Sequence, residues 1–266
     1  MCATARHAQG SFIVKMHVLS GGLLRMRRHV YVPDAQRDET IDLPVSAFLL
    51  RHAQGNVLFD TGCHPQALAD APSRWGTMAK ALQPIGDAND HVLTGLTQLG
   101  LAAQDIDVVI NSHFHTDHCG CNEFFKNATL ICHEKELLAA QGEDALAQGY
   151  LPSDWDHPMP TQTIDREWDV FGDRKLCLIP LPGHTPGTLG AMVTTATSGA
   201  FLLVADALAL QHNYEREAMP KNTWDKDLAL HSLREVKKIE QAGAKVIFGH
   251  DLQQWQSLRK GAHAYE

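Results

Sequence analysis

The segment Asn-Ser-His-Phe-His-Thr-Asp-His, at residues 111–118, restricts most strongly how this chain can fold. It directly follows a short apolar run without alternation, which predicts a buried strand. His113 and His115 are two residues apart, so on an extended segment both point to the same side and can share one metal ion. Asp117 and His118 come after a turn and face elsewhere, which suits a second ion. The segment therefore predicts a metal site at the end of a buried strand.

Three further residues of the metal-ligand type come at the ends of predicted strands. His184 lies in a tight Gly/Pro turn straight after a strand. Asp206 ends the strand predicted at Phe201–Ala205, and His250 follows the strand predicted at Lys245–Phe248. Taken singly, Asp206 could cap the next segment and His250 could be a core histidine. Together with the first cluster, however, coincidence explains these positions poorly.

The rest of the sequence predicts two runs of strands, each ending in helices. The predicted strands are Ser11–Leu19, Leu24–Val32, Val45–Arg51, Val57–Asp60, Ile106–Asn111, Ala128–Cys132, Lys175–Leu181, Gly187–Thr194, Phe201–Ala205 and Lys245–Phe248. The predicted helices are Asp90–Leu99, Glu134–Gln141 and Asp225–Gly243, with Ala67–Gln83 helical or irregular and broken by Pro72. Gly142–Glu167 is polar and proline-rich, which predicts a surface excursion of the kind that covers active sites. The pattern predicts an α/β fold, a four-layer αββα sandwich in which residues 1–266 form a single domain.

Composition narrows the function classes. The chain has 266 residues, of which 44% are hydrophobic and 20% charged, as is typical of a globular protein. Its formal net charge of -8 argues against a nuclease, which usually needs a basic face. No apolar run approaches the ~18 residues of a membrane span, and no secretory signal is recognisable, so a cytoplasmic protein is expected. The six cysteines form no Cys-x-x-Cys pair, and a disulfide framework is not expected.

These motifs together resemble the metallo-β-lactamase superfamily, whose hallmark is His-x-His-x-Asp-His followed by a Gly-His turn, an Asp and a final Gly-His. The resemblance spans nearly the whole chain and includes Val57–Gly62, in which Asp60 would support the site from behind. It implies that His113, His115 and His184 bind a first metal, that Asp117, His118 and His250 bind a second, and that Asp206 bridges both. Zinc is the expected metal, with iron, manganese or cobalt as alternatives. Cys119 and Cys121 are expected to be small buried thiols, and contact with the second metal is the alternative.

Within the superfamily, the chain most resembles the N-acyl homoserine lactonases, which are quorum-quenching enzymes. The features that carry this resemblance are Asp42–Arg51, Glu215–Pro220 and Gly249–Trp255. The resemblance implies that a metal-bridging hydroxide opens the ester ring of a lactone, most simply an N-acyl homoserine lactone. Asp117 is the candidate that takes up the proton and passes it to the leaving group.

One position departs from the lactonase pattern. Those enzymes usually carry a tyrosine three residues after the bridging Asp, where its phenol helps to hold the lactone carbonyl, but here the position is Ala209. The metal alone could polarise the carbonyl, or His212 or Tyr214 could replace the phenol. The third alternative is a different substrate, such as a bulkier or aromatic lactone or a plain ester.

Other members of the superfamily fit less well. A glyoxalase II-type thioesterase adds a C-terminal helical domain, whereas only 16 residues follow His250. A persulfide dioxygenase has a single iron on two His and one Asp, whereas this chain has a complete second set. The missing signal disfavours a secreted β-lactamase, and the acidic balance disfavours a ribonuclease. A non-enzymatic binding module with structural metals is disfavoured because the ligand set leaves a position for water.

The expected partner is a small-molecule lactone or ester, and neither nucleic acid nor membrane binding is expected. The N-terminal segment and Gly142–Glu167 are candidates for the substrate mouth or for a homodimer contact, and the sequence does not choose between these roles.

Overall fold

The computed structural model describes residues 14–266, so the start of the predicted strand Ser11–Leu19 lies outside the described residues. Within them, a seven-stranded sheet has the order β4-β1-β2-β3-β5-β6-β7, and a five-stranded sheet has the order β12-β11-β10-β9-β8. The strands of the larger sheet are β1 Lys15–Arg27, β2 Thr40–His52, β3 Gly55–Phe59, β4 Gln83–Pro84, β5 Val108–Ile110, β6 Thr129–His133 and β7 Thr161–Ile164. Those of the smaller sheet are β8 Trp168–Asp169, β9 Leu176–Pro180, β10 Leu189–Thr194, β11 Ala200–Leu203 and β12 Lys245–Ile247.

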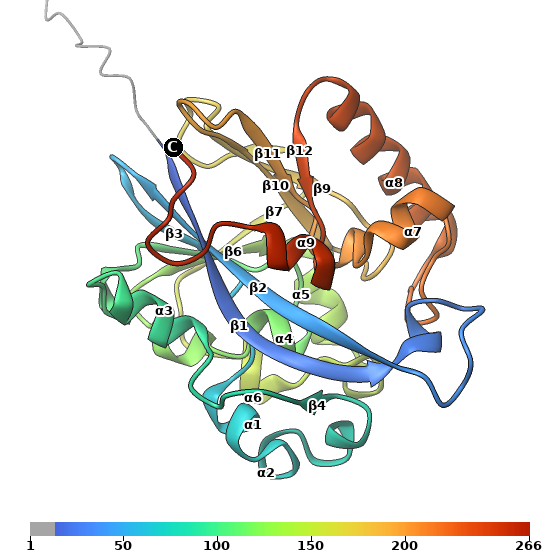
Figure 1. Ribbon diagram of the computed structural model, residues 1–266. Coiled ribbons are helices and arrows are strands. Elements are labelled where there is room, and N and C mark those ends of the chain that lie inside the picture. Colours follow the sequence, from blue (N-terminus) through green and yellow to red (C-terminus); the bar gives the residue numbers. More distant parts are fainter. Residues whose placement is uncertain (1–13) are drawn as a thin grey trace, which may run out of the picture.

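Helices cover the outer faces of both sheets (Figure 1). The α-helices are α1 Pro65–Ala69, α2 Ala71–Trp75, α3 Val92–Gln98, α4 Thr116–Cys119, α5 Glu134–Ala140, α6 Pro152–Trp155, α7 Gln211–Arg216, α8 Lys226–Gln241 and α9 Leu252–Ser257. Short 3₁₀ turns include η1 Arg28–Val30, η2 Gly76–Lys80, η3 Ala103–Asp105, η4 Asn122–Phe124, η5 Leu146–Gln148 and η6 Ala205–Leu208. In the described part of the chain, none of the helices has the length and apolar character that crossing a bilayer requires.

Three buried clusters define four layers. Between the two sheets, Phe48 and Phe59 of the larger sheet join Leu178 and Leu203 of the smaller one in a single apolar core. The outer face of the larger sheet packs against α3 and α5, and that of the smaller sheet packs against α8. These contacts confirm the predicted α/β four-layer αββα architecture.

The first strand is longer than the sequence predicts. Two strands were expected, at Ser11–Leu19 and Leu24–Val32, with a break at the two glycines between them. The structure instead has one continuous strand, β1, whose register against β2 shifts between Ser20 and Gly22. This irregularity is a β-bulge, which accommodates the glycines without ending the strand. The predicted end of the second strand is also wrong, because residues 28–30 form the turn η1.

Most residues of Gly142–Glu167 are exposed, in agreement with the predicted surface excursion, but the segment also has regular structure and a few buried residues. It contains α6 and also β7, which pairs in parallel with β6. Tyr150 and Asp154 are buried, with exposed fractions of 1% and 0%. Asp154 tolerates burial because Arg74 pairs with it, at 2.6 Å between Nη2 and Oδ1. A few residues of this mainly exposed segment therefore belong to the interior.

Candidate metal centre

The directions of the strands bring the predicted ligands to one region. Asp60 follows β3 and His113 lies just beyond β5, and these two strands are parallel neighbours. In the smaller sheet, β9 and β11 are both antiparallel to β10, and β12 is parallel to β11. The carboxyl ends of β9, β11 and β12 therefore lie at one edge, with His184, Asp206 and His250 beyond them. The two sheets are stacked, and the ligands beyond the strand ends of one sheet contact those of the other: His184 contacts His115, and Asp206 contacts His118.

The first group consists of three histidine nitrogens. Nε2 of His113 lies 3.1 Å from Nδ1 of His115, and Nε2 of His184 lies 3.0 Å from the same Nδ1. Burial is the largest influence on two of these rings, lowering the pKa of His113 well below its usual range and that of His184 to about 3. Neutral imidazoles whose lone pairs converge in this way are suited to coordinate a cation.

The second group comes from the start of α4 and the end of β12. Because α4 begins at Thr116, Asp117 and His118 lie in its first turn and leave the extended course of the preceding histidines. Oδ2 of Asp117 lies 3.7 Å from Nε2 of His118 and 3.6 Å from Nε2 of His250. Burial opposes a charge on His118, but Asp117, Asp206 and Asp60 together raise its pKa well above the usual range. The surroundings of this group therefore favour positive charge.

Asp206 lies between the two groups. Its Oδ1 is 3.3 Å from Nε2 of His118 and 2.8 Å from Nε2 of His250, and its Oδ2 is 3.4 Å from Nε2 of His184. Despite these short separations, Oδ1 of Asp206 and the Nε2 atoms of His118 and His250 are not aligned for hydrogen bonds, so all three are buried without a hydrogen-bond partner. Buried polar atoms are normally paired. Three orphaned ligand-type atoms that converge on one space fit a site for divalent cations.

In four of the five histidines, the ring nitrogen that points away from the cluster is held by an oxygen. The pairs are His113 Nδ1 with Ser112 Oγ at 3.0 Å, His115 Nε2 with the Gln148 carbonyl at 2.9 Å, His118 Nδ1 with Asp60 Oδ2 at 2.8 Å, and His250 Nδ1 with the Pro44 carbonyl at 2.9 Å. Such outer partners fix the tautomer and the orientation of ligand histidines. Asp60 also accepts hydrogen bonds from the amide and the hydroxyl of Ser112. The structure thus places Asp60 behind the cluster, where the sequence predicted it.

Comparison with known proteins assigns the family. Residues 40–255 match the model of the metallo-beta-lactamase superfamily. The chain belongs to this superfamily. It is 33% identical to the N-acyl homoserine lactonase AiiB of Agrobacterium fabrum over 245 residues, which cover 85% of this chain and 86% of that protein. It is 28% identical to the N-acyl homoserine lactonase AttM of Azorhizobium caulinodans, covering 95% and 99%.

A solved structure agrees with this assignment. An N-acyl homoserine lactone hydrolase with N-hexanoyl-L-homoserine bound at its catalytic metal centre superposes with a TM-score of 0.86. The two chains are 26% identical, and the match covers 95% of this chain and 99% of that one. Within the metallo-β-lactamase superfamily, this chain therefore belongs to the family of the N-acyl homoserine lactonases.

A buried carboxylate that the sequence did not single out connects two ligand segments of this metallo-β-lactamase fold. Oε1 of Glu136 accepts a hydrogen bond of 3.0 Å from the amide of Phe114. Its Oε2 accepts hydrogen bonds from the hydroxyl of Thr185, at 2.7 Å, and from the amide of Gly187, at 3.0 Å. Glu136 thus ties the segment between the first two histidines to the turn that carries His184. Nothing local in the sequence separates it from the exposed Glu134 on the same helix.

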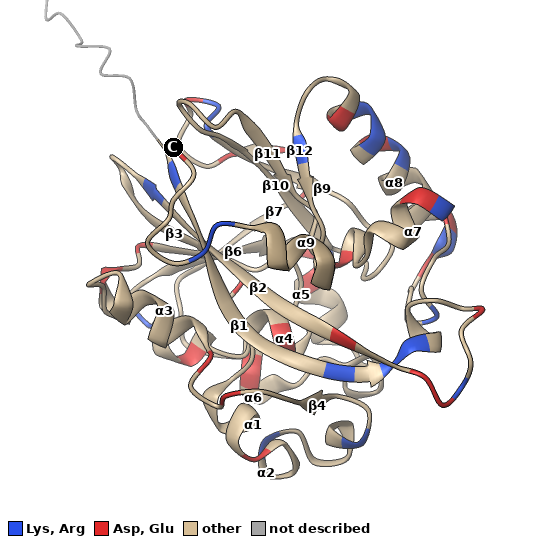
Figure 2. Cartoon of the chain, viewed as in Figure 1, with Lys and Arg blue, Asp and Glu red and all other residues tan. Residues whose placement is uncertain are grey.

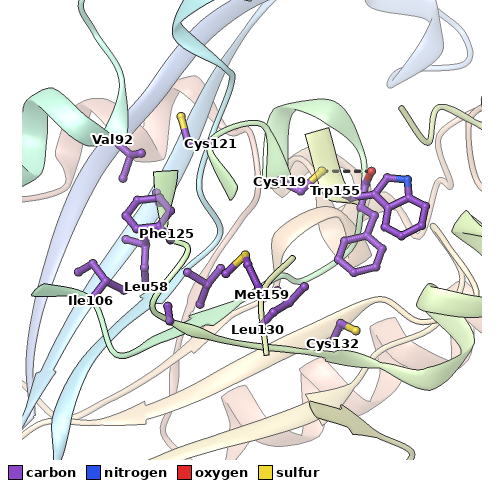
Figure 3. Close-up of a cluster of buried hydrophobic side chains, with 14 of the residues drawn as sticks. Leu58, Val92, Ile106, Cys119, Cys121, Phe125, Leu130, Cys132, Trp155 and Met159 are labelled. Atoms are coloured by element: carbon purple, nitrogen blue, oxygen red, sulfur yellow. Dashed lines mark hydrogen bonds between the residues drawn. The ribbon is translucent and has the colours of Figure 1, made fainter. Parts of the chain in front are cut away.

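The cysteines beside the cluster of this family member are buried thiols, as expected. Figure 3 shows Cys119 and Cys121 in the buried cluster on the outer face of the larger sheet. The thiol of Cys119 donates to the carbonyls of Phe114 and His115, and that of Cys121 donates to the carbonyl of Cys63. Neither belongs to the groups of ligand-type residues found among residues 14–266. Burial also raises the pKa of both thiols, which disfavours the thiolate that a metal would need.

The structure brings neither His212 nor Tyr214 to the metal cluster. The hydroxyl of Tyr214 donates to Glu240 of α8, and its ring centroid lies 5.7 Å from that of Phe248. His212 lines a separate hollow of about 460 Å³ that also contains Asp251 and Arg25. Both residues lie on α7, which turns them away from the site. The alternative that either one replaces the lactonase tyrosine is therefore wrong.

Two cavities flank His115 in this lactonase-family fold. One, of about 260 Å³, contains Asp117 and Asp206, and its wall is formed mainly by the apolar or aromatic side chains Met26, Tyr31, Met78, Leu82 and Leu146. The other, of about 300 Å³, contains His184 and is lined by Tyr150, Thr185 and Trp224 among others. The hollow beside His212 is larger, but it contains none of the seven predicted ligands. Of these three cavities, only the two smaller ones are lined by predicted ligands.

Proposed function

We propose that this chain is a metal-dependent hydrolase that opens the ester ring of N-acyl homoserine lactones, with two metal ions held by the seven predicted side chains. The observation that carries the proposal is the position of Asp206 between two ligand groups, both of which border an apolar cavity. The relatives named as N-acyl homoserine lactonases support it. So does the related structure with an acyl-homoserine product at its catalytic metal centre.

The residues divide the work as follows. Divalent ions bound here would activate water as a nucleophile and polarise the ester carbonyl. His113, His115 and His184 would hold the first ion, Asp117, His118 and His250 the second, and Asp206 both. Asp117 also lines the cavity, so its carboxylate is placed to take the proton of the attacking water and deliver it to the ring oxygen as the ester bond breaks.

The cavity wall supports an acylated substrate. Met26, Met78, Leu82 and Leu146 offer an apolar surface beside the ligand cluster. An acyl chain bound there would be removed from contact with water, which stabilises binding by about 0.8 kcal/mol for each buried CH₂ group. In Figure 2, Lys and Arg are spread over β1, β12 and α8, which is compatible with a substrate that carries no phosphate. Zinc as the metal, a cytoplasmic location, the single-domain organisation and a homodimer stay predictions from the sequence.

A second candidate function is hydrolysis of a bulkier lactone or a plain ester. The observation that favours it is Ala209, a small residue where the lactonases resembled by this chain usually carry tyrosine. Rates across a panel of homoserine lactones, aromatic lactones and aryl esters distinguish the two functions.

The test compares purified protein, chelator-treated protein and chelator-treated protein to which zinc is returned. We expect acyl-homoserine lactones to be the best substrates, with activity lost on chelation and regained with zinc. His113→Ala should be inactive, whereas His212→Ala, which changes a histidine of the separate hollow that contains none of the ligands, should match the parent. Full activity after complete removal of metal would refute the proposal.

A further inference from the structure

Tyr31 reaches the ligand cluster from the turn that follows β1. Its side chain is buried and lines the apolar cavity that contains Asp117 and Asp206. Its ring stands edge-on to the ring of His250, with 6.3 Å between centroids and an interplanar angle of 75°. Asn222 lines the same cavity, and its side chain interacts with the Tyr31 hydroxyl. A phenol carries its proton at neutral pH, so the Tyr31 hydroxyl can donate a hydrogen bond beside the candidate site.

The backbone around Tyr31 is fixed to the segment that follows the bridging aspartate. The side-chain amide of Asn213 donates a hydrogen bond of 2.8 Å to the carbonyl of Tyr31. The amide of Lys221 donates a hydrogen bond of 2.7 Å to the carbonyl of Val30. The position of the phenol therefore follows from contacts with residues far away in the sequence and does not depend on the turn alone.

Ala209 leaves room for this arrangement. Tyr31, Ala209 and Leu210 belong to one buried apolar cluster, and Ala209 has an exposed fraction of 1%. A tyrosine at position 209 would add a ring to a cluster that already contains the ring of Tyr31. Overpacking of this kind usually costs about 1–3 kcal/mol. The small residue at 209 and the large one at 31 are thus mutually compatible.

We propose that Tyr31 is a substrate-binding residue whose hydroxyl donates a hydrogen bond to the ester carbonyl, from a ring that uses the space left by Ala209. The inference rests on the proposed function, because it names a contact of that same active site. It assigns a protein donor to the carbonyl in addition to any metal. The substrate that accepts this hydrogen bond is a lactone or an ester, since both have the same carbonyl oxygen.

The test removes only the hydroxyl. We expect Tyr31→Phe to lower kcat/KM for N-hexanoyl homoserine lactone by about 10- to 100-fold, since loss of a donor that stabilises a developing oxyanion has effects of this order or larger. Its metal content should stay parental, and calorimetry should show weaker binding of the product N-hexanoyl-homoserine. Tyr214→Phe is the matched control, because its hydroxyl faces Glu240, and it should stay within about twofold of the parent.

Relocating the phenol tests the shared space. Ala209→Tyr alone and Tyr31→Ala alone should each lose activity, and the double variant should recover at least about tenfold over Tyr31→Ala. If the parent opens lactones and Tyr31→Phe does so with the same kcat/KM, this inference is overturned, but the proposed function still holds. Loss of bound metal in step with activity would also overturn the inference, because the role would then be structural. A parent that opens no lactone would overturn both.

Discussion

Removing the carboxylate of Glu136 should destabilise the metal-loaded protein by a calculable amount. Two backbone amides, of Phe114 and Gly187, and the hydroxyl of Thr185 depend on it as an acceptor. Each buried donor left unpaired costs about 1–3 kcal/mol. Glu136→Ala leaves both amides unpaired, so we expect a loss of about 4 kcal/mol in the free energy of unfolding.

Glu136→Gln should have a smaller effect. The glutamine keeps one carbonyl oxygen but turns an NH₂ group toward one of the former donors, which costs about 1–3 kcal/mol. Burial raises the pKa of Glu136, so removal of its charge recovers part of that cost. We therefore expect a loss of about 2 kcal/mol for this variant, with an affinity for zinc below that of the parent.

Guanidinium unfolding of the zinc-loaded proteins, followed by circular dichroism, measures these differences. Competition with a chromophoric chelator measures the zinc affinity. Glu134→Gln is the control, because Glu134 lies on the same helix with an exposed side chain and should change stability by less than about 0.5 kcal/mol. If both Glu136 variants match this control, Glu136 does not connect the two ligand segments energetically.

Three further predictions concern Asp60, Arg74 and the cysteines. Asp60→Asn should weaken metal binding by about 10- to 100-fold in chelator competition, because Asp60 orients a ligand histidine; a change under twofold would contradict this. Arg74→Met should lower the free energy of unfolding by about 3 kcal/mol, because it leaves the Asp154 carboxylate buried without its cation, and a loss below 1 kcal/mol would show that the pair matters little. Iodoacetamide should label the partly exposed Cys177 of the native protein well before the buried Cys121, and equal rates in peptide mapping would disagree with the structure.

The ligand cluster could be predicted because its signals are local. Two histidines at a spacing of two indicate a shared metal ion without reference to distant residues. The single ligand-type residues directly after strands are ambiguous one by one, but together with this cluster they point to the same site. The positions of His184, Asp206 and His250 then follow from the strand directions.

Features that depend on distant contacts could not be predicted. The Gly21-Gly22 pair looks like a strand break, yet a Cβ on Gly62 would lie only 2.4 Å from the Cα of Gly21, so the glycines serve a close approach within a continuous strand. The backbone at Tyr31 is held in place by Asn213, which lies far along the chain and donates a hydrogen bond to its carbonyl. The sequence around Asp154 predicts a surface residue, because it does not reveal the ion pair with Arg74 that allows its burial.

Anomalous X-ray diffraction from zinc-loaded crystals at the zinc absorption edge shows whether two metal ions bind at the proposed ligands. We expect two peaks, one among His113, His115 and His184 and the other among Asp117, His118 and His250, with Asp206 contacting both. Catalytically active crystals with no peak in this cluster, or with zinc bound only elsewhere, would contradict this expectation.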